Sequence, residues 1–340
     1  MFETLDHARV AEIHCKSDPH SRLHAIVAIH NTRLGAALGG CRFIPYRDDE
    51  SALKDAVRLA RGMSYKAALA GVPQGGGKAV IMRPTTGFDR AELFKKFGEF
   101  VEDLGGRYIT AIDSGTNLSD MDFVASKTLH VTGCLRDGFD PSPMTALGVF
   151  EGIKAAVKFR LGQVHLRGVC VAIQGLGNVG WALADLLHEA GAKLILADID
   201  ETKLSLAKDR FNAKIASPEQ IISERCDIFS PCALGGAIND KTISLLKCQI
   251  IAGSANNQLD RNEHGDELHR LSILYAPDYV INSGGLIKVS LRHSGIEEAK
   301  VVEKTLKIAD TLTTIFQSSV RDKKPTHRVA DAMAEKILFH

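Results

Sequence analysis

The sequence predicts an α/β protein with two domains, and three observations support this prediction. The chain has 340 residues, more than the ~250–300 residues at which a single hydrophobic core stops growing. Short apolar runs typical of strands alternate with amphipathic, helix-like runs. Near residue 133 the pattern changes to strands that are apolar throughout, which is typical of a parallel sheet covered by helices on both faces.

The composition excludes several classes of protein. With 45% hydrophobic residues, 24% charged residues and a formal net charge of +1, the sequence gives no indication of nucleic-acid or membrane partners. We find no apolar run of the ~18 residues that a membrane span needs, and no signal-peptide pattern at the N-terminus. Seven scattered cysteines without a Cys-x-x-Cys pair fit reduced thiols in the cytoplasm. The 13 histidines show no metal-binding spacing, so no metal site is expected.

In the first part of the chain, residues 25–30 and 41–46 are predicted strands, and the small-residue stretch 35–40 between them is a predicted turn. Apolar residues at helical spacing predict a helix within 49–70, with Asp49 or Ser51 near its cap. The next predicted elements are a strand at 78–84, a helix at 88–106, a strand at 107–113 and a helix from 117.

The second part of the chain begins with a helix at 141–161 that is led by proline, a residue favoured at helix starts. A strand, a glycine turn, a helix and another strand follow within 168–200. Further strands are predicted at 226–233, 248–255 and 274–285, the last of which enters a glycine turn. The tail at 297–338 has helical spacing and is expected to fold back onto the first domain.

A dinucleotide-binding motif is the strongest local signal. It comprises Gly175, Leu176, Gly177, Asn178, Val179 and Gly180, between a predicted strand and a predicted helix. The first glycine would make a tight turn, the second would let the backbone approach pyrophosphate, and the third would let helix and strand pack closely. Asp198 ends the next strand and would bind the adenosine ribose, with Asp200 as a rival; its negative charge favours NAD over NADP. The alternative is a tight turn without a ligand.

Lys78 directly follows three glycines, which suggests that the backbone and this lysine must approach something closely. A phosphate-binding loop is excluded, because Val72 stands where that motif needs glycine and Ala79 where it needs serine or threonine. The simple alternative is a turn that leads into a strand and leaves Lys78 exposed. If Lys66 and Asp113 share a cleft with Lys78, however, the neighbouring cation would lower the pKa of Lys78, as a general base near neutral pH requires. Each of those two residues could instead be a solvated surface charge.

Eight motifs follow one another along nearly the whole chain: GGCRFIPY, DAVRLARGMSYKAALAG, GGGKAVI, AIDSGTNLSDMD, QGLGNVG, PCALGGAIND, AGSANNQL and YAPDYVINSGG. In sequence and in order they resemble the motifs of the Glu/Leu/Phe/Val dehydrogenase family. They are most similar to those of its leucine, phenylalanine and valine dehydrogenases.

The resemblance implies an N-terminal catalytic domain with an α/β fold like that of amino acid dehydrogenases. It would comprise residues 1–132 plus about 320–340 and would also form the contacts between subunits of an oligomer. A Rossmann domain at 133–319 that binds NAD is also implied, with a cleft between the two domains. The implied reaction is the reversible oxidative deamination of an L-amino acid to a 2-oxo acid and ammonia, in a homo-oligomer. Lys66 would bind the substrate carboxylate, Lys78 would activate water, and Asp113 would exchange protons with the amine.

The resemblance also implies a larger set of binding residues. The residues expected to line the substrate site are Leu38, Gly39, Gly40, Met63, Lys66, Ala111, Thr132, Asn257, Leu286 and Val289. The cofactor would be contacted by the glycine loop, Asp198, Ala233, Asn256 and Asn282. Six of these residues are expected to surround the substrate side chain, and they are mostly apolar and uncharged: Leu38, Met63, Ala111, Thr132, Leu286 and Val289. Such a pocket disfavours glutamate, whose second carboxylate would need a basic partner.

Two alternatives remain open at this stage. Leucine and valine fit the pocket first, but phenylalanine or another aromatic amino acid is possible, since one methylene is worth only ~1–3 kcal/mol. A protein of a different class, an inactive NAD-binding sensor, is disfavoured by the intact lysines and aspartate. Ile112, Ser114 and Lys288 depart from residues that are common in the family, and none of them replaces a matched catalytic residue.

Overall fold

The computed structural model describes residues 5, 9–134 and 140–340, which form two compact units. Unit 1 comprises Met1–Asp140, Val289–Gly295 and Ala334–His340, and unit 2 comprises Pro141–Lys288 and Ile296–Met333. The main division thus lies at residue 140, whereas the sequence-based division lay at 132. The C-terminal return to unit 1 begins at residue 334 rather than near 320, and the short segment 289–295 was not expected in it.

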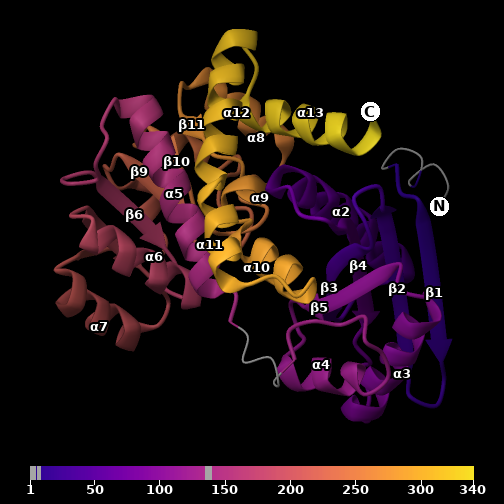
Figure 1. Cartoon of the computed structure of the whole chain (residues 1–340). Coiled ribbons are helices and arrows are strands. Elements are labelled where there is room, and N and C mark those ends of the chain that lie inside the picture. The colour runs from indigo at the N-terminus through magenta and orange to yellow at the C-terminus, as the bar shows by residue number, and fades with distance from the viewer. Residues whose placement is uncertain (1–4, 6–8, 135–139) are drawn as a thin grey trace. The chain divides into compact units, whose positions relative to one another are not determined.

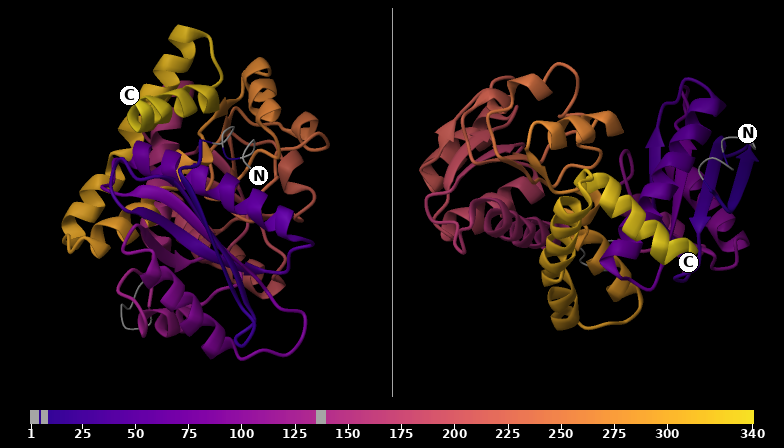
Figure 2. Two further views of the ribbon diagram at one scale, coloured as in Figure 1. Left: turned by 90° about the vertical axis from the view of Figure 1, so that its right-hand side faces the viewer. Right: turned by 90° about the horizontal axis from the view of Figure 1, so that it is seen from above.

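Unit 1 contains a five-stranded mixed sheet with the order β1-β2-β4-β3-β5. The strands are β1 (Glu12–Asp18), β2 (Leu23–Asn31), β3 (Ala37–Ile44), β4 (Gly75–Met82) and β5 (Tyr108–Ile112). β1 and β4 are antiparallel to β2, while β3 is parallel to both β4 and β5. α2 (Asp49–Ala70) lies across one face, and α3 (Arg90–Asp103) and α4 (Leu118–Ala125) cover the other (Figures 1 and 2).

The three glycines before Lys78 belong to the central strand β4 and are not a turn. A Cβ atom on Gly76 would lie 2.0 Å from the backbone nitrogen of Ser64 on α2, and one on Gly77 would lie 2.9 Å from the ring of Tyr108. The glycines therefore let α2 and Tyr108 pack directly against the strand. The expectation of a strand that starts at Lys78 was wrong, as was that of a turn at 35–40, since β3 begins at Ala37. Both strands begin before their predicted starts and include glycines, a residue that local propensity disfavours in strands. The glycines are there because close packing leaves no room for a side chain.

Unit 2 contains a six-stranded sheet with the order β11-β10-β9-β6-β7-β8, in which every described strand pair is parallel. The strands are β6 (Cys170–Gln174), β7 (Lys193–Ala197), β8 (Lys214–Ile215), β9 (Ile228–Pro231), β10 (Ile250–Ile251) and β11 (Leu274–Tyr275). The α/β class with a parallel, Rossmann-type sheet is therefore confirmed. The outer strands are shorter than expected, and the predicted strand 274–285 is wrong beyond Tyr275, because helices follow it.

Helices complete both units. They are α5 (Ser142–Leu161), α6 (Asn178–Glu189), α7 (Glu201–Phe211), α8 (Asn262–Arg270), α9 (Asp278–Ile281), α10 (Gly284–His293), α11 (Glu298–Leu306), α12 (Ile308–Asp322) and α13 (Thr326–Phe339). In unit 2, α5 packs beside both α6 and α12 (Figure 1). Within the described ranges, we find no helix long and apolar enough to cross a membrane.

Candidate active site

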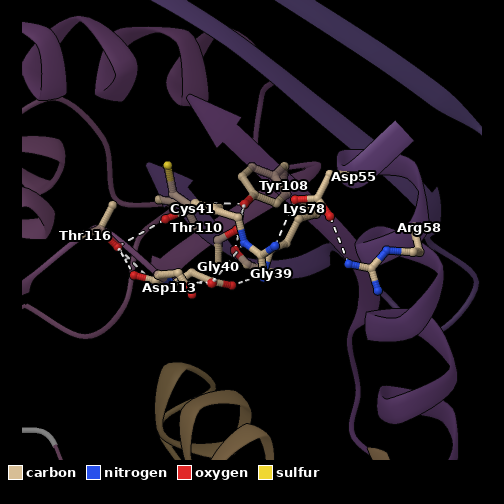
Figure 3. Close-up of polar contacts among 12 residues, drawn as sticks. Gly39, Gly40, Cys41, Asp55, Arg58, Lys78, Tyr108, Thr110, Asp113 and Thr116 are labelled. Atoms are coloured by element: carbon tan, nitrogen blue, oxygen red, sulfur yellow. Dashed lines mark hydrogen bonds and ion pairs between the residues drawn. The ribbon is translucent and has the colours of Figure 1, made fainter. Parts of the chain in front are cut away.

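The structure brings Lys78 and Asp113 into direct contact. Lys78 lies in β4 and is only 5% exposed, and its Nζ atom donates to Oδ2 of Asp113, which directly follows β5 (Figure 3). Asp113 lies over Gly40 of β3, where a Cβ atom would come within 2.9 Å of the same carboxylate oxygen. Gly40 is therefore needed for the approach of the acid. Two residues far apart in the sequence meet because β3 pairs with β4 on one side and with β5 on the other.

The backbone around Asp113 fixes the orientation of its carboxylate. The N–H of Ser114 donates to Oδ1 (2.5 Å), and the N–H of Asp113 itself donates to Oγ1 of Thr116 (2.8 Å). The Thr116 hydroxyl also bonds to the carbonyl oxygen of Cys41 (3.1 Å), which ties the turn to β3. Asp113 thus presents Oδ2 toward Lys78 from a rigid turn.

Burial, together with the neighbouring positive charges of Arg42 and Lys66, lowers the pKa of Lys78 to about 7. Lys66 lies in α2, and its side chain is half-buried. Because half of a lysine population with a pKa near 7 is neutral at pH 7, Lys78 can take up a proton under physiological conditions. Asp113, in contact with it, can accept or return that proton.

Sequence reasoning missed Arg42 and Asp55, which complete the charged cluster. Arg42 in β3 donates from Nη1 to Oδ2 of Asp55 on α2 (2.8 Å), and its Nε atom lies 3.6 Å from Oδ1 of Asp113. Arg42 lies within one of the quoted family motifs, so a signal was present. Its role depends on which strand lies beside β3, and the sequence pattern does not give that.

The residues predicted to line the side-chain pocket are divided between the units. In unit 1, Leu38 and Thr132 are buried, whereas Met63, Ala111 and Val289 are half-buried. Leu286 is buried in unit 2. Gly39 lies in β3, where its carbonyl accepts a hydrogen bond from the Tyr108 hydroxyl (2.7 Å). All of these remain predicted substrate contacts.

The glycine loop in unit 2 has the backbone that its motif predicts. Gly175 has a φ of 102°, a conformation that side chains rarely adopt, and a Cβ atom on Gly180 would lie 2.0 Å from the Gly175 carbonyl oxygen. A Cβ atom on Gly177 would meet nothing within 4 Å. Gly177 is the N-cap of α6, and no side chain caps this helix in the described structure. The first amides of α6, at Asn178, Val179 and Gly180, are therefore available to an anionic ligand.

Asp198 faces this loop from the end of β7. Its Oδ2 atom accepts the N–H of Leu176 (2.5 Å) and its Oδ1 atom accepts the N–H of Asp200 (2.9 Å). Burial alone would raise the pKa of Asp198, but these backbone hydrogen bonds lower it, so the carboxylate is ionised at neutral pH. The rival residue, Asp200, accepts from the N–H groups of Thr202 and Lys203 as the N-cap of α7.

A buried acceptor in unit 2 also fits a dinucleotide ligand. Asn282 is 3% exposed and donates from Nδ2 to the Ser254 carbonyl (3.0 Å) and to Oδ1 of Asn256 (2.7 Å). Its own Oδ1 atom is buried and has no hydrogen-bond partner in the described structure. A ligand amide would satisfy this acceptor. Ala233 lies against Gly175, while Asn256 and Asn257 are exposed.

The residues that depart from the family pattern have local structural roles. Ile112 is partly exposed at 38%, and Ser114 supplies the N–H that orients Asp113. Lys288 forms an ion pair with Glu298 within unit 2 (3.5 Å). Across the described residues, no group of three or more histidine, cysteine, aspartate or glutamate side chains could hold a metal ion.

Comparisons with known proteins match both parts of the chain. Residues 7–130 match the dimerisation domain of Glu/Leu/Phe/Val dehydrogenases, and residues 140–202 and 196–334 match Glutamate/Leucine/Phenylalanine/Valine dehydrogenase. The chain is 48% identical over 338 residues to leucine dehydrogenase of Geobacillus stearothermophilus, which covers 98% of this chain and 91% of the relative. It is 46% identical over 340 residues to L-tryptophan dehydrogenase of Nostoc punctiforme, with 98% and 95% covered.

A solved structure extends the similarity to the fold. The crystal structure of L-tryptophan dehydrogenase from Nostoc punctiforme aligns with a TM-score of 0.89 at 42% identity, over 99% of this chain and 98% of that chain. Taken with the two α/β units, these matches define the class: the protein is an amino acid dehydrogenase, an oxidoreductase that uses a nicotinamide dinucleotide. The chain belongs to the Glu/Leu/Phe/Val dehydrogenase family.

Proposed function

We propose that the protein catalyses the reversible oxidative deamination of an apolar L-amino acid, with leucine or another branched-chain amino acid preferred and NAD as the hydride acceptor. The contact between a buried Lys78 and Asp113 carries this proposal. It supplies a neutral amine and a carboxylate side by side, which the proton transfers of this reaction require.

The proposed roles follow from the chemistry of each step. The Lys66 ammonium binds the substrate carboxylate. Asp113 takes a proton from the substrate ammonium group; the α-carbon then loses a hydride, for which NAD would supply the acceptor, and an iminium forms. Lys78 removes a proton from the water that attacks the iminium carbon, which gives a carbinolamine, and releases that proton to solvent. Asp113 returns its proton to the nitrogen, and Lys78 takes the hydroxyl proton as ammonia departs and the carbonyl forms. The loop from Gly175 to Gly180, with Ala233, Asn256 and Asn282, would hold the cofactor.

The preference for a branched-chain substrate rests on the pocket residues and the relatives. Leu38, Met63, Ala111, Leu286 and Val289 are apolar, and with Thr132, Gly39, Gly40 and Asn257 they offer no charge to a second carboxylate. A relative at 48% identity is a leucine dehydrogenase. Other relatives are L-tryptophan and phenylalanine dehydrogenases, so an aromatic substrate is the second candidate.

The choice of NAD over NADP rests on Asp198. Its carboxylate is ionised and lies beside the glycine loop, where it would accept the ribose hydroxyls and repel a 2′-phosphate. We also propose a homo-oligomer, because residues 7–130 match a dimerisation domain. A cytoplasmic location is supported by the seven free cysteines.

A panel of L-amino acids assayed with NAD and with NADP tests this function. We expect NADH formation with leucine, valine and isoleucine, a lower kcat/KM with phenylalanine and tryptophan, and no measurable turnover of glutamate. With NADP, kcat/KM should be at least ~100-fold lower, because the 2′-phosphate of the adenosine ribose would face an ionised aspartate. Turnover of glutamate, or equal use of the two cofactors, would contradict the assignment.

A further inference from the structure

Arg42 is a charged residue of the site for which the proposed reaction gives no role. It lies in β3, opposite Val80 of β4, and its guanidinium is held on one side by Asp55. Asp55 also accepts a hydrogen bond from the Tyr46 hydroxyl (2.8 Å). It accepts another from Nη2 of Arg58 (2.9 Å) (Figure 3). Burial would raise the pKa of Asp55, but the Tyr46 hydrogen bond and the two arginines lower it. An ionised Asp55 therefore anchors Arg42.

The other side of Arg42 faces the catalytic pair. Its Nε atom is buried and has no hydrogen-bond partner within the described structure, and it lies 3.6 Å from Oδ1 of Asp113. Leaving a buried donor unpaired is costly, and an apolar side chain would fill a purely structural position without that cost. The distance is just beyond a hydrogen bond, so a small movement of Asp113 would let Nε donate to it.

We propose that Arg42 is a positioning residue for the reaction: anchored on Asp55, it keeps the Asp113 carboxylate turned toward Lys78 and favours the neutral form of the Lys78 amine. The inference rests on the proposed roles of Lys78 and Asp113. Oδ2 of Asp113 accepts a hydrogen bond from Lys78, and Oδ1 forms an ion pair with Arg42 at 3.6 Å. A single carboxylate therefore lies between two cations.

The electrostatics around Lys78 agree with this role. The charged and titratable groups that face it are Arg42 and Cys41 from β3, Asp55 and Lys66 from α2, and Asp113 after β5; its partner in β2 is the uncharged Ala28. After burial, the charge of Arg42 is the largest cause of the lowered pKa of Lys78, whereas the charge of Asp55 acts in the opposite direction.

Arg42 and Asp55 carry opposite charges, so their removal should shift the pKa of Lys78 in opposite directions. A merely structural role of Arg42 predicts no such pair of shifts. In Arg42→Gln, the loss of a positive charge should raise the pKa of Lys78, so the acidic limb of the pH profile of kcat/KM should move up. We expect a move of about one pH unit, the lower end of the shift that a nearby charge produces. Activity at pH 7 should fall about fivefold, because the neutral fraction of Lys78 drops from about one half to about one eleventh, and it should recover at alkaline pH. Arg42→Lys, which keeps the charge, should retain a limb close to that of the wild type. Asp55→Asn should move the limb down.

Two further measurements complete the test. Arg47→Gln is the matched control, since Arg47 lies in the same segment with a side chain that is 87% exposed, and its profile should match the wild type. The pH dependence of Lys78 acetylation by acetic anhydride, followed by mass spectrometry, should show the same shifts in the free protein without any turnover. If those shifts appear while no amino acid is oxidised, the proposed function fails, whereas the effect of Arg42 on the Lys78 amine stands.

A loss of activity that is independent of pH and equal in Arg42→Gln and Arg42→Lys would overturn the proposal. Shifts of the same sign in Arg42→Gln and Asp55→Asn would overturn it too. If Arg42→Gln does not fold, as judged by circular dichroism, the comparison of Arg42→Lys with Asp55→Asn still decides, because only the second should lower the pH at which Lys78 becomes reactive.

Discussion

Replacement of Lys78 by alanine should abolish nearly all turnover while leaving the binding of NAD unchanged. A general base contributes typically ~10²–10⁴-fold, and Lys78 is proposed to take a proton both in the attack of water and in the collapse of the carbinolamine, so we expect kcat to fall by at least ~10³-fold. NAD should bind normally, because the glycine loop and Asp198 belong to unit 2, whereas Lys78 belongs to unit 1. Stopped-flow absorbance of NADH and fluorescence titration of NADH measure the two quantities separately.

The control for this variant is Lys54→Ala, which removes a lysine with a side chain that is 62% exposed and so leaves the charged cluster intact. Its kcat should equal that of the wild type. Turnover of Lys78→Ala within tenfold of the wild type would rule out the assigned base. Loss of NADH binding in that variant would instead indicate that the substitution disturbs more than the catalytic step.

Replacement of Asp113 by asparagine should lower kcat by ~10²–10⁴-fold, because the amide keeps the size of the side chain but cannot accept the proton of the substrate amine. A second signature separates this loss from misfolding. The Asp113 carboxylate contacts the Lys78 ammonium and favours it, so its removal should lower the pKa of Lys78 further. The pH at which Lys78 becomes reactive toward acetic anhydride should therefore fall.

Asp103→Asn serves as the control for the aspartate substitution, since the Asp103 side chain is 62% exposed and pairs with Lys16 in a surface contact. It should change neither kcat nor the reactivity of Lys78. An Asp113→Asn variant that retains wild-type kcat, or in which the pKa of Lys78 rises, would contradict the proposed exchange of protons between the two residues.

The glycine loop was predictable from sequence because its function is local. A turn with a positive φ at Gly175, an open N-cap at Gly177 and close packing at Gly180 all depend on residues within one strand–turn–helix unit. The same holds for α2, which was predicted within 49–70 with Asp49 or Ser51 near its cap. The helix spans Asp49–Ala70, and its N-cap is Asp48, which accepts the N–H of Ser51. Where neighbours in sequence determine the structure, the pattern was sufficient.

The surroundings of Lys78 were not predictable, because they depend on residues that are distant in the chain. The glycines before it suggested space for a ligand, but Gly76 is required by Ser64 on α2, which packs on its backbone. The involvement of Arg42 follows from the register of β3 beside β4 and from the Asp55 carboxylate on α2. Strand order and register depend on contacts between segments that are distant in the chain, and the local pattern of one sequence does not show these contacts.

The titration of Lys78 in the wild-type protein tests the central claim most directly. The rate of acetylation of its amine by acetic anhydride, measured by mass spectrometry from pH 5 to pH 11, follows the neutral fraction of this one residue without substrate or cofactor. We predict a half-maximal rate near pH 7, since burial and the charge of Arg42 lower the pKa of Lys78 to about 7. A half-maximal rate at pH ~10.4, the pKa of a lysine in a peptide, would contradict this claim.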